Sequence, residues 1–246
     1  MFAFFSETSF LPQHIVLSRS RFILTHGLLP ALLLGTLFVG LEWSGLDIWL
    51  GRHFYDPIAR EWPYKDHWLI QKVFHKGGRL VFFAIVASIL VMVLRSFKMG
   101  SALKPYRRGF LYLFLASISG PLIIMALKNR THIYCPWDLQ LFGSFKPYIR
   151  WADAVTIAMP VGHCFPAAHA GSGFAFVSFY FFFLAVCSDY KFRGLSFGLI
   201  LGELYGFTQQ MRGAHFLSHD VMALAICWFM SLGLFIVFFR KQLQWQ

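Results

Sequence analysis

The sequence predicts an all-α integral membrane protein: a bundle of six transmembrane helices with an amphipathic first loop that lies along the membrane surface. Two observations support this prediction. Hydrophobic residues make up 57% of the 246-residue chain and charged residues only 13%, against about a quarter in soluble domains. In addition, six apolar runs approach the ~20 residues that a helix needs to cross ~30 Å of hydrocarbon. Because we find no repeat and no second domain, we expect a single membrane-embedded domain over residues 1–246.

The six apolar runs are separated by polar connections. They cover residues 22–41, 80–94, 109–127, 170–187, 194–209 and 221–239. Pro30 and Pro121 fall inside two of them, which membrane helices tolerate because neighbouring groups satisfy the freed backbone. The first 21 residues lack the order of basic, apolar and small residues of a cleaved signal peptide, so we do not expect them to be one.

The first connection, residues 42–79, consists of amphipathic pieces separated by Pro57 and Pro63. Tryptophans recur along it at a spacing that suits headgroup anchors: Trp43, Trp49, Trp62 and Trp68. Since tryptophan prefers the membrane–water interface, we expect this connection to lie along the membrane surface.

The formal net charge of +11 is unevenly distributed along the chain. Basic residues crowd one short connection and follow the last run: Arg95, Lys98, Lys104, Arg107, Arg108, Arg240 and Lys241. By the positive-inside rule this face, with both termini, should be cytoplasmic, and the longer connections should face the periplasm of a bacterial inner membrane. Membrane lipids therefore explain the charge, and we expect no nucleic-acid partner. The oligomeric state is left open.

Eight of the ten histidines lie in the three outer connections. We interpret His53, His67 and His75, in the first connection, as interfacial residues, because a lone imidazole is seldom a catalyst. The other five are His132, His163, His169, His215 and His219, and all but His163 fall in three polar segments at helix ends, residues 128–138, 164–172 and 209–220. Because these segments share one predicted face of the membrane, we expect them to form a single site.

Taken in order, the three segments resemble the motifs of the membrane-bound type 2 phosphatidic acid phosphatase superfamily, which comprises lipid phosphatases and phosphotransferases. Lys128 precedes Cys135-Pro136 by seven residues, as the lysine of the first family motif precedes Arg-Pro. Pro166-Ala167-Ala168-His169 is similar to the second motif, Pro-Ser-Gly-His, and His215 matches the histidine of the third. The six-helix plan and the surface-lying first loop also fit, so the resemblance covers nearly the whole chain.

The chain departs from all three motifs. Cys135, Ala167, Ala168, Gln209 and His219 stand where the family has Arg, Ser, Gly, Arg and Asp. Such Cys-Pro-Trp-Asp and Gly-Ala-His-Phe variants resemble a bacterial branch of the superfamily. The departures leave a catalytically inactive paralogue as an alternative to an enzyme.

The resemblance implies an enzyme of lipid metabolism that hydrolyses or transfers the phosphate of a lipid phosphate or diphosphate, of the undecaprenyl diphosphate, lipid A or phospholipid type. It implies that His215 attacks phosphorus to form a phosphohistidine and that His169 protonates the leaving group. Cations and N–H groups must offset the charge on the phosphate oxygens, and we assign this task to Lys128, Arg130, Arg212 and the start of the fourth run with Gly171 and Ser172. No cofactor is implied.

A nucleophilic imidazole needs an acceptor on its other ring nitrogen, and two residues compete for this role. His219, four residues after His215, lies almost in line on a helix. Asp220, five residues after it, would support a positive imidazole more strongly because it is a carboxylate. Both remain candidates.

The same residues also permit other interpretations. The histidines with Asp138 and Asp220 could form a metal site, since His215 and His219 have the spacing of zinc ligands on a helix. The neighbouring Lys and Arg side chains favour an anion, so we expect no metal. Cys135 and Cys164 would form a disulfide in an oxidising periplasm, and two free buried thiols are the alternative.

Overall fold

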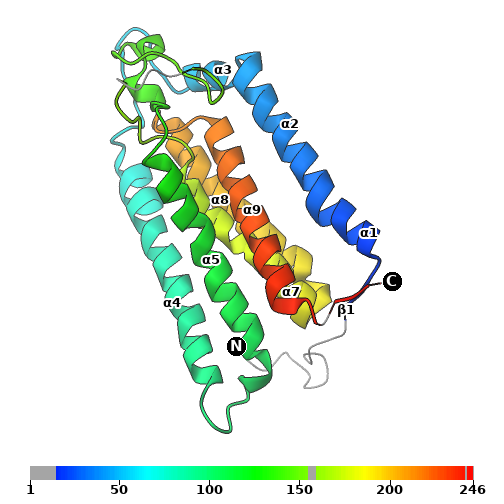
Figure 1. Cartoon of the computed structure of the whole chain (residues 1–246). Coiled ribbons are helices and arrows are strands. Elements are labelled where there is room, and N and C mark those ends of the chain that lie inside the picture. Colours follow the sequence, from blue (N-terminus) through cyan, green and yellow to red (C-terminus); the bar gives the residue numbers. More distant parts are fainter. Residues whose placement is uncertain (1–14, 155–158, 242, 246) are drawn as a thin grey trace.

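The computed structural model describes residues 15–154, 159–241 and 243–245, and these are helical apart from loops and one short strand pairing. The strands β1 (Ile15–Leu17) and β2 (Leu243–Trp245) run parallel, with Ile15 opposite Leu243. This pairing brings the two outermost described segments side by side at one end of the bundle (Figure 1).

Six helical stretches follow the six apolar runs of the sequence. They are α1 (Arg19–Phe22), η1 (Ile23–Leu28) and α2 (Leu29–Ser44); η2 (Leu69–Gly77) and α4 (Gly78–Ser96); η3 (Lys104–Tyr106) and α5 (Arg107–Lys128); α6 (Ala168–Phe174), η6 (Ala175–Val177) and α7 (Ser178–Val186); α8 (Lys191–Met211); and α9 (Leu217–Phe239). Four shorter helices lie in the connections: α3 (Leu46–Arg52), η4 (Pro136–Asp138), η5 (Gln140–Phe142) and η7 (Ser188–Tyr190).

Among the described residues, five of these stretches are long and apolar enough to cross a membrane. They are Arg19–Ser44, Leu69–Ser96, Lys104–Lys128, Ala168–Val186 and Leu217–Phe239. The remaining stretch, α8, has 21 residues, but Glu203, the pair Gln209–Gln210 and its glycines make it less apolar. The predicted multi-pass helical architecture is therefore confirmed, whereas the sixth crossing stays a prediction.

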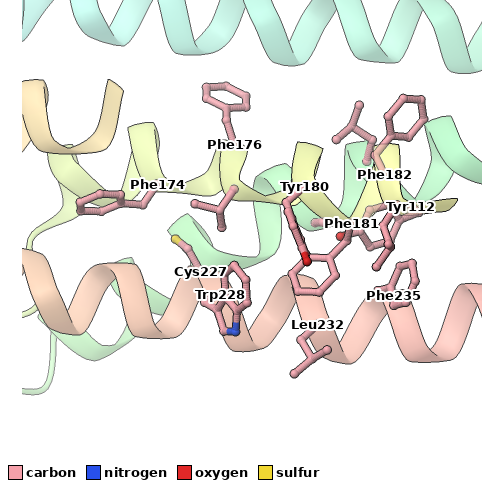
Figure 2. Packing of buried hydrophobic residues seen from close by; sticks show 14 of the residues in the cluster. Tyr112, Phe174, Phe176, Tyr180, Phe181, Phe182, Cys227, Trp228, Leu232 and Phe235 are labelled. Atoms are coloured by element: carbon pink, nitrogen blue, oxygen red, sulfur yellow. The ribbon is translucent and has the colours of Figure 1, made fainter. Parts of the chain in front are cut away.

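The centre of the bundle is aromatic. Tyr112 of α5, Phe176 of η6, Phe181 of α7 and Phe235 of α9 have no exposed surface and lie together in one cluster (Figure 2). The Tyr112 hydroxyl donates to the Ser231 carbonyl oxygen at 3.2 Å, which satisfies a polar group that would otherwise be buried without a partner. Leucines on the outer faces of α2 and α4 are exposed instead, as expected of helices that face lipid tails.

The helix α8 packs against the α6–α7 stretch at backbone distance. Glycines recur every four residues along α8 and so share one face: Gly194, Gly198, Gly202 and Gly206. A Cβ atom on Gly202 would overlap the ring of Phe174, and one on Gly198 would overlap the backbone at Val177. Small residues at this spacing let membrane helices approach closely. The contact fixes the position of the α8 C-terminal end, which leads to His215.

The connections at one end of the bundle fold together as a cap, which we define as residues 45–68, 129–154 and 159–163 (Figure 1). Its apolar cluster contains Trp62, Tyr134, Leu139, Phe142 and Ile149, together with Phe216 from beyond the cap. Trp62 is only 7% exposed, so its prediction as a headgroup anchor is wrong: its ring packs against those of Tyr55 and Phe142. Trp43, Trp49 and Trp68 are exposed.

The substitution Gly202→Ala should lower the melting temperature of the purified protein, because the new methyl group overlaps the ring of Phe174. Overpacking of this kind costs about 1–3 kcal/mol, which corresponds to several degrees in a chain of this size. Gly233→Ala in α9 is the matched control, since no atom lies within 4 Å of a Cβ there. Equal melting temperatures for the two variants would contradict the close approach of α8.

Candidate active site

Three segments that are distant in sequence meet at the capped end of the bundle, as the sequence predicted, and the first of them, residues 128–138, belongs almost wholly to the cap. Hydrogen bonds tie them in pairs: Thr131 Oγ1 donates to the Phe165 carbonyl at 2.6 Å, Trp137 N–H to the Gly213 carbonyl at 2.9 Å, and Ala167 N–H to the His219 carbonyl at 3.2 Å. The ends of α5 and α8 and the beginnings of α6 and α9 therefore face one common region.

His215 lies in the tight connection between α8 and α9 and is only 7% exposed. Its Nδ1 lies 3.5 Å from Nδ1 of His219, in the first turn of α9. Burial lowers the pKa of His215 well below its ordinary value, and the positive charge of Lys128 lowers it further. His215 is therefore neutral at pH 7, the form in which an imidazole nitrogen offers a lone pair.

His219 and Asp220, the two candidates for orienting His215, differ in their contacts. Asp220 is buried and turns to α8: its Oδ2 accepts a hydrogen bond from Gln210 Nε2 at 2.7 Å. The Asp220 carboxylate also lies against Gly206, where a Cβ atom would come within 2.5 Å of Oδ2. His219 is thus the candidate in contact with His215.

His169, in the first turn of α6, is held from three sides and is 8% exposed. Its Nε2 lies 3.2 Å from the Phe74 carbonyl oxygen. Because a carbonyl only accepts, Nε2 carries the proton and Nδ1 is the nitrogen left for proton exchange. The ring stacks on Tyr205 with centroids 4.6 Å apart and meets the ring of His75 at 4.8 Å.

His75, which the sequence analysis assigned to the interface, therefore belongs beside the site. It lies in η2, just before Gly77 and Gly78. A Cβ atom on Gly78 would lie 2.9 Å from the Tyr205 ring and 3.2 Å from His169 Cε1. Gly78, three residues after His75, therefore leaves room for this close approach.

The three predicted phosphate-binding cations occupy different environments. Arg212 is buried, and its Nε donates to the Lys65 carbonyl at 2.8 Å while Nη1 donates to Gln209 Oε1 at 3.0 Å. Lys128, at the end of α5, is half-buried, and its charge acts on His215. Arg130 is exposed beyond the end of α5. The charge of Arg212 acts on His169 and His75. The structure thus brings Lys128 and Arg212 near the histidines and leaves Arg130 at the surface.

Gly171 and Ser172, which the sequence suggested as donors at the start of α6, are both engaged within the helix. The Ser172 hydroxyl donates to the His169 carbonyl oxygen at 2.6 Å, and the Gly171 N–H donates to the Ala167 carbonyl oxygen at 3.0 Å. Both donors are used within the first turn of the helix, because serine readily bonds to a backbone carbonyl of the preceding turn. Ser172 therefore supports the His169 backbone in this structure.

Cys135 and Cys164 are joined in a disulfide, with Cα atoms 5.2 Å apart, which links the first and second segments. Cys164, His215 and His219 also form a group whose potential ligand atoms lie within 4.8 Å of one another. A disulfide sulfur carries no thiolate charge, and it is the thiolate that binds metals. With Cys164 oxidised, two imidazoles remain beside the charge of Lys128, an environment that suits an anion better than a metal ion.

Two acidic residues that the sequence analysis missed reach the beginning of α9. Asp47 Oδ1 accepts the Ser218 N–H at 3.1 Å, and Glu42 Oε1 lies 3.4 Å from the Ser218 hydroxyl. Both side chains are buried, at 1% and 4% exposure, and burial raises the pKa of Asp47. Negative charge at a helix N-terminus is stabilising because it faces unpaired N–H groups.

The comparison with protein families gives one match. A family model described as the PAP2 superfamily matches residues 109–243, more than half of the chain. This range contains all three polar segments, most of α5 and all of α6 to α9, whereas α1 to α4 and the first part of the cap lie before it. No curated protein and no solved structure matches the chain.

Alkylation mapping of the native protein should place the only reducible pair at Cys135 and Cys164. These two should resist a maleimide after denaturation until a reductant is added, whereas Cys187 and Cys227, which are buried free thiols, should react on denaturation alone. The double variant Cys135→Ser/Cys164→Ser should lose on the order of 3 kcal/mol of stability, from the loop-closure entropy of a loop of this length. Labelling of Cys135 without reductant would contradict the pairing.

Proposed function

The chain belongs to the PAP2 superfamily, whose members are generally phosphatases, and from this premise we propose that it hydrolyses or transfers the phosphate of a lipid phosphate or diphosphate. The observation that carries the proposal is the meeting of His215, His219 and His169 with Lys128 and Arg212 beneath the cap. The proposed setting is the outer face of a bacterial inner membrane, with both termini in the cytoplasm.

In the proposed reaction, a ring nitrogen of His215 attacks phosphorus and the bond to the leaving oxygen breaks. His169, protonated on Nδ1 as well as on the Nε2 that bonds to the Phe74 carbonyl, gives its Nδ1 proton to the leaving oxygen and becomes neutral, and the phosphate remains on His215 as a phosphohistidine. Water, or the hydroxyl or phosphate of a second lipid, then attacks the same phosphorus from the opposite side and releases His215. In this second step the attacking water or hydroxyl returns a proton to Nδ1 of His169. Lys128 and Arg212 offset the negative charge that the phosphate oxygens carry throughout.

The position of the site favours a lipid as the substrate. Lys128 and His169 lie at the ends of helices that are long and apolar enough to cross a membrane, which supports a site at the depth of lipid headgroups. Undecaprenyl diphosphate, lipid A phosphates, phosphatidylglycerol phosphate and phosphatidic acid are the substrates we propose to test. Hydrolysis and transfer share the phosphohistidine and differ only in the acceptor.

Replacement of either histidine by alanine, His215→Ala or His169→Ala, should lower phosphate release by on the order of a hundredfold or more, because each removes a reacting group. Purified protein is assayed with the four lipids, with and without a second lipid as acceptor. His53→Ala is the control, because His53 is an exposed histidine on the same face, bonded to the Trp49 carbonyl. In wild type, a phosphoenzyme that is labile in acid and stable in base should form, and His215→Ala should abolish it.

Two results would overturn this function. Wild-type protein that releases no phosphate from any of the lipids favours an inactive paralogue. Turnover that EDTA abolishes and zinc restores favours a metal site at His215 and His219, the alternative that their spacing leaves open.

The pH dependence of kcat/KM should show no acid limb from His215 above pH 6. The pKa of His215 is lowered well below its ordinary value, so the neutral, nucleophilic form predominates in the free enzyme over this range. With an ordinary pKa of ~6.5, the neutral fraction would fall about fourfold between pH 8 and pH 6. An aryl phosphate with a good leaving group is the substrate to use, because its departure does not need the proton of His169. After correction for substrate ionisation, a fourfold fall would show that His215 titrates normally.

A further inference from the structure

We propose that Asp47 is the positioning residue for His215 and that it acts through one water molecule held jointly by Asp47, Trp62 and His215. The inference rests on the proposed function, because it supplies the carboxylate that a nucleophilic histidine requires. Asp47 lies in α3 (Leu46–Arg52), in the part of the chain that precedes the PAP2 match.

The need for such a carboxylate follows from the chemistry of the site. An imidazole that forms a bond to phosphorus becomes positively charged, and a carboxylate on its second nitrogen stabilises that charge. His219, the ring in contact with His215, carries no negative charge. Asp220 is engaged by Gln210 on α8. The positive charge of Lys128 disfavours a second positive charge on His215, so it increases the need for a carboxylate.

A small cavity connects Asp47 with His215. Its volume is about 10 Å³, and Asp47, Trp62, Gln210 and His215 line it together with apolar side chains and Pro136. This volume is at the lower limit of what one water molecule requires. The cavity lies between the cap, which includes α3, and the connection from α8 to α9, and the polar groups among its mostly apolar lining can bind a water molecule.

Two unpaired polar atoms belong to residues that line this same cavity. Asp47 Oδ2 and Trp62 Nε1 are both buried and have no hydrogen-bond partner among the described residues. A carboxylate oxygen only accepts, and an indole N–H only donates. One water that accepts from Trp62 and donates to Asp47 satisfies both atoms and keeps a lone pair and a proton for further bonds, one of them to His215.

Asp47 is fixed in position by its other oxygen. Oδ1 accepts the Ser218 N–H at 3.1 Å, so the carboxylate cannot rotate freely and Oδ2 stays available to the cavity. Because burial disfavours the charge on Asp47, the carboxylate gains from a positive charge nearby. Positive charge forming on His215 and negative charge on Asp47 therefore stabilise each other across the water.

Glu42 provides a matched comparison. It is nearly as buried as Asp47, at 4% against 1%, and it also reaches Ser218. Its Oε2 already accepts the Trp151 N–H at 2.9 Å, and Glu42 does not line the cavity. A purely structural effect of a buried acid at the start of α9 should therefore appear in Glu42 and Asp47 variants alike, whereas an effect on His215 should be confined to Asp47.

The first test compares Asp47→Asn with Glu42→Gln in purified full-length protein. Asp47→Asn keeps an oxygen for Ser218 but removes the charge, and it should lower kcat about 10–100-fold, the range found when a group that orients an imidazole is lost. KM should stay within about twofold, because the substrate phosphate does not touch Asp47. Rapid-quench measurement should show the same loss in the rate of phosphoenzyme formation. Glu42→Gln should leave kcat and the rate of phosphoenzyme formation unchanged, and its melting temperature should be similar to that of Asp47→Asn.

The second test is a double-mutant cycle with Trp62→Phe, which removes the N–H but retains an aromatic ring. Trp62→Phe alone should lower kcat, and Asp47→Asn/Trp62→Phe should be no slower than Asp47→Asn, because both residues act through one water. Additive losses would overturn the shared water. If Asp47→Asn fails to fold, Trp62→Phe carries the test by itself, and an unchanged kcat in that variant overturns the proposal.

The outcomes separate this inference from the proposed function. Active wild type with equal rates for Asp47→Asn and Glu42→Gln overturns the role of Asp47 and leaves the phosphohistidine mechanism intact. Wild type that forms no phosphoenzyme and releases no phosphate overturns the proposed function itself, and the role of Asp47 falls with it.

Discussion

The backbone contact between α8 and the α6–α7 stretch determines where the reacting side chains lie. His169 begins α6, and His215 follows the end of α8 by four residues, so the distance between the two histidines depends on how these helices pack. Gly173 and Gly202 face each other without side chains, and a Cβ atom on Gly173 would lie 2.5 Å from the Gly202 Cα. Any larger residue would separate the helices. Because catalysis by positioned groups is lost with displacements of about 1 Å, the glycine face of α8 is a condition for the site and not merely for the fold.

Burial is the second constraint, and it changes what each charge in the site can do. His215, His219 and Arg212 are all less than a tenth exposed. The disulfide between Cys135 and Cys164 holds the first polar segment, residues 128–138, against the second, residues 164–172. In a region that excludes water, a cation interacts more strongly with phosphate than it would at the surface. Two cations can therefore suffice where the resemblance to the family suggested more. The same burial keeps His215 neutral and suited to attack, and it makes any uncompensated charge costly.

The sequence predicted local features well and tertiary contacts poorly. Each apolar run corresponds to a helical stretch. The second stretch starts at Leu69, well before the predicted residue 80. The prediction was late because the polar residues Lys72, His75 and Lys76 interrupt the apolar pattern at the beginning of the helix. Helical geometry predicted that His215 and His219 lie close together. Their Nδ1 atoms are 3.5 Å apart, but His215 lies in the connection before α9 and not on the helix. Asp47, Trp62 and His75 were missed, because their roles arise from the packing of the first connection on segments far away in sequence. No period or motif in the sequence indicates a contact between segments that are far apart in the chain. The spacing within one polar segment, by contrast, does indicate which of its residues lie close together.

The replacement of an acidic residue by His219 alters the architecture that the site needs. A carboxylate on α9 itself would keep the charge balance of the nucleophile within one helix. With a neutral ring in that place, and with Asp220 of the same turn bonded to Gln210, the acid that lines the cavity beside His215 is Asp47, which comes from before the matched family range. The residues that hold His169 also come from before the matched range. The Phe74 carbonyl and the ring of His75, both in η2, contact its imidazole. In the proposed mechanism the histidines are thus supplied by one part of the chain and oriented by the other. If His215 is the nucleophile, that mechanism requires the first connection to dock onto the bundle, because Asp47 belongs to it.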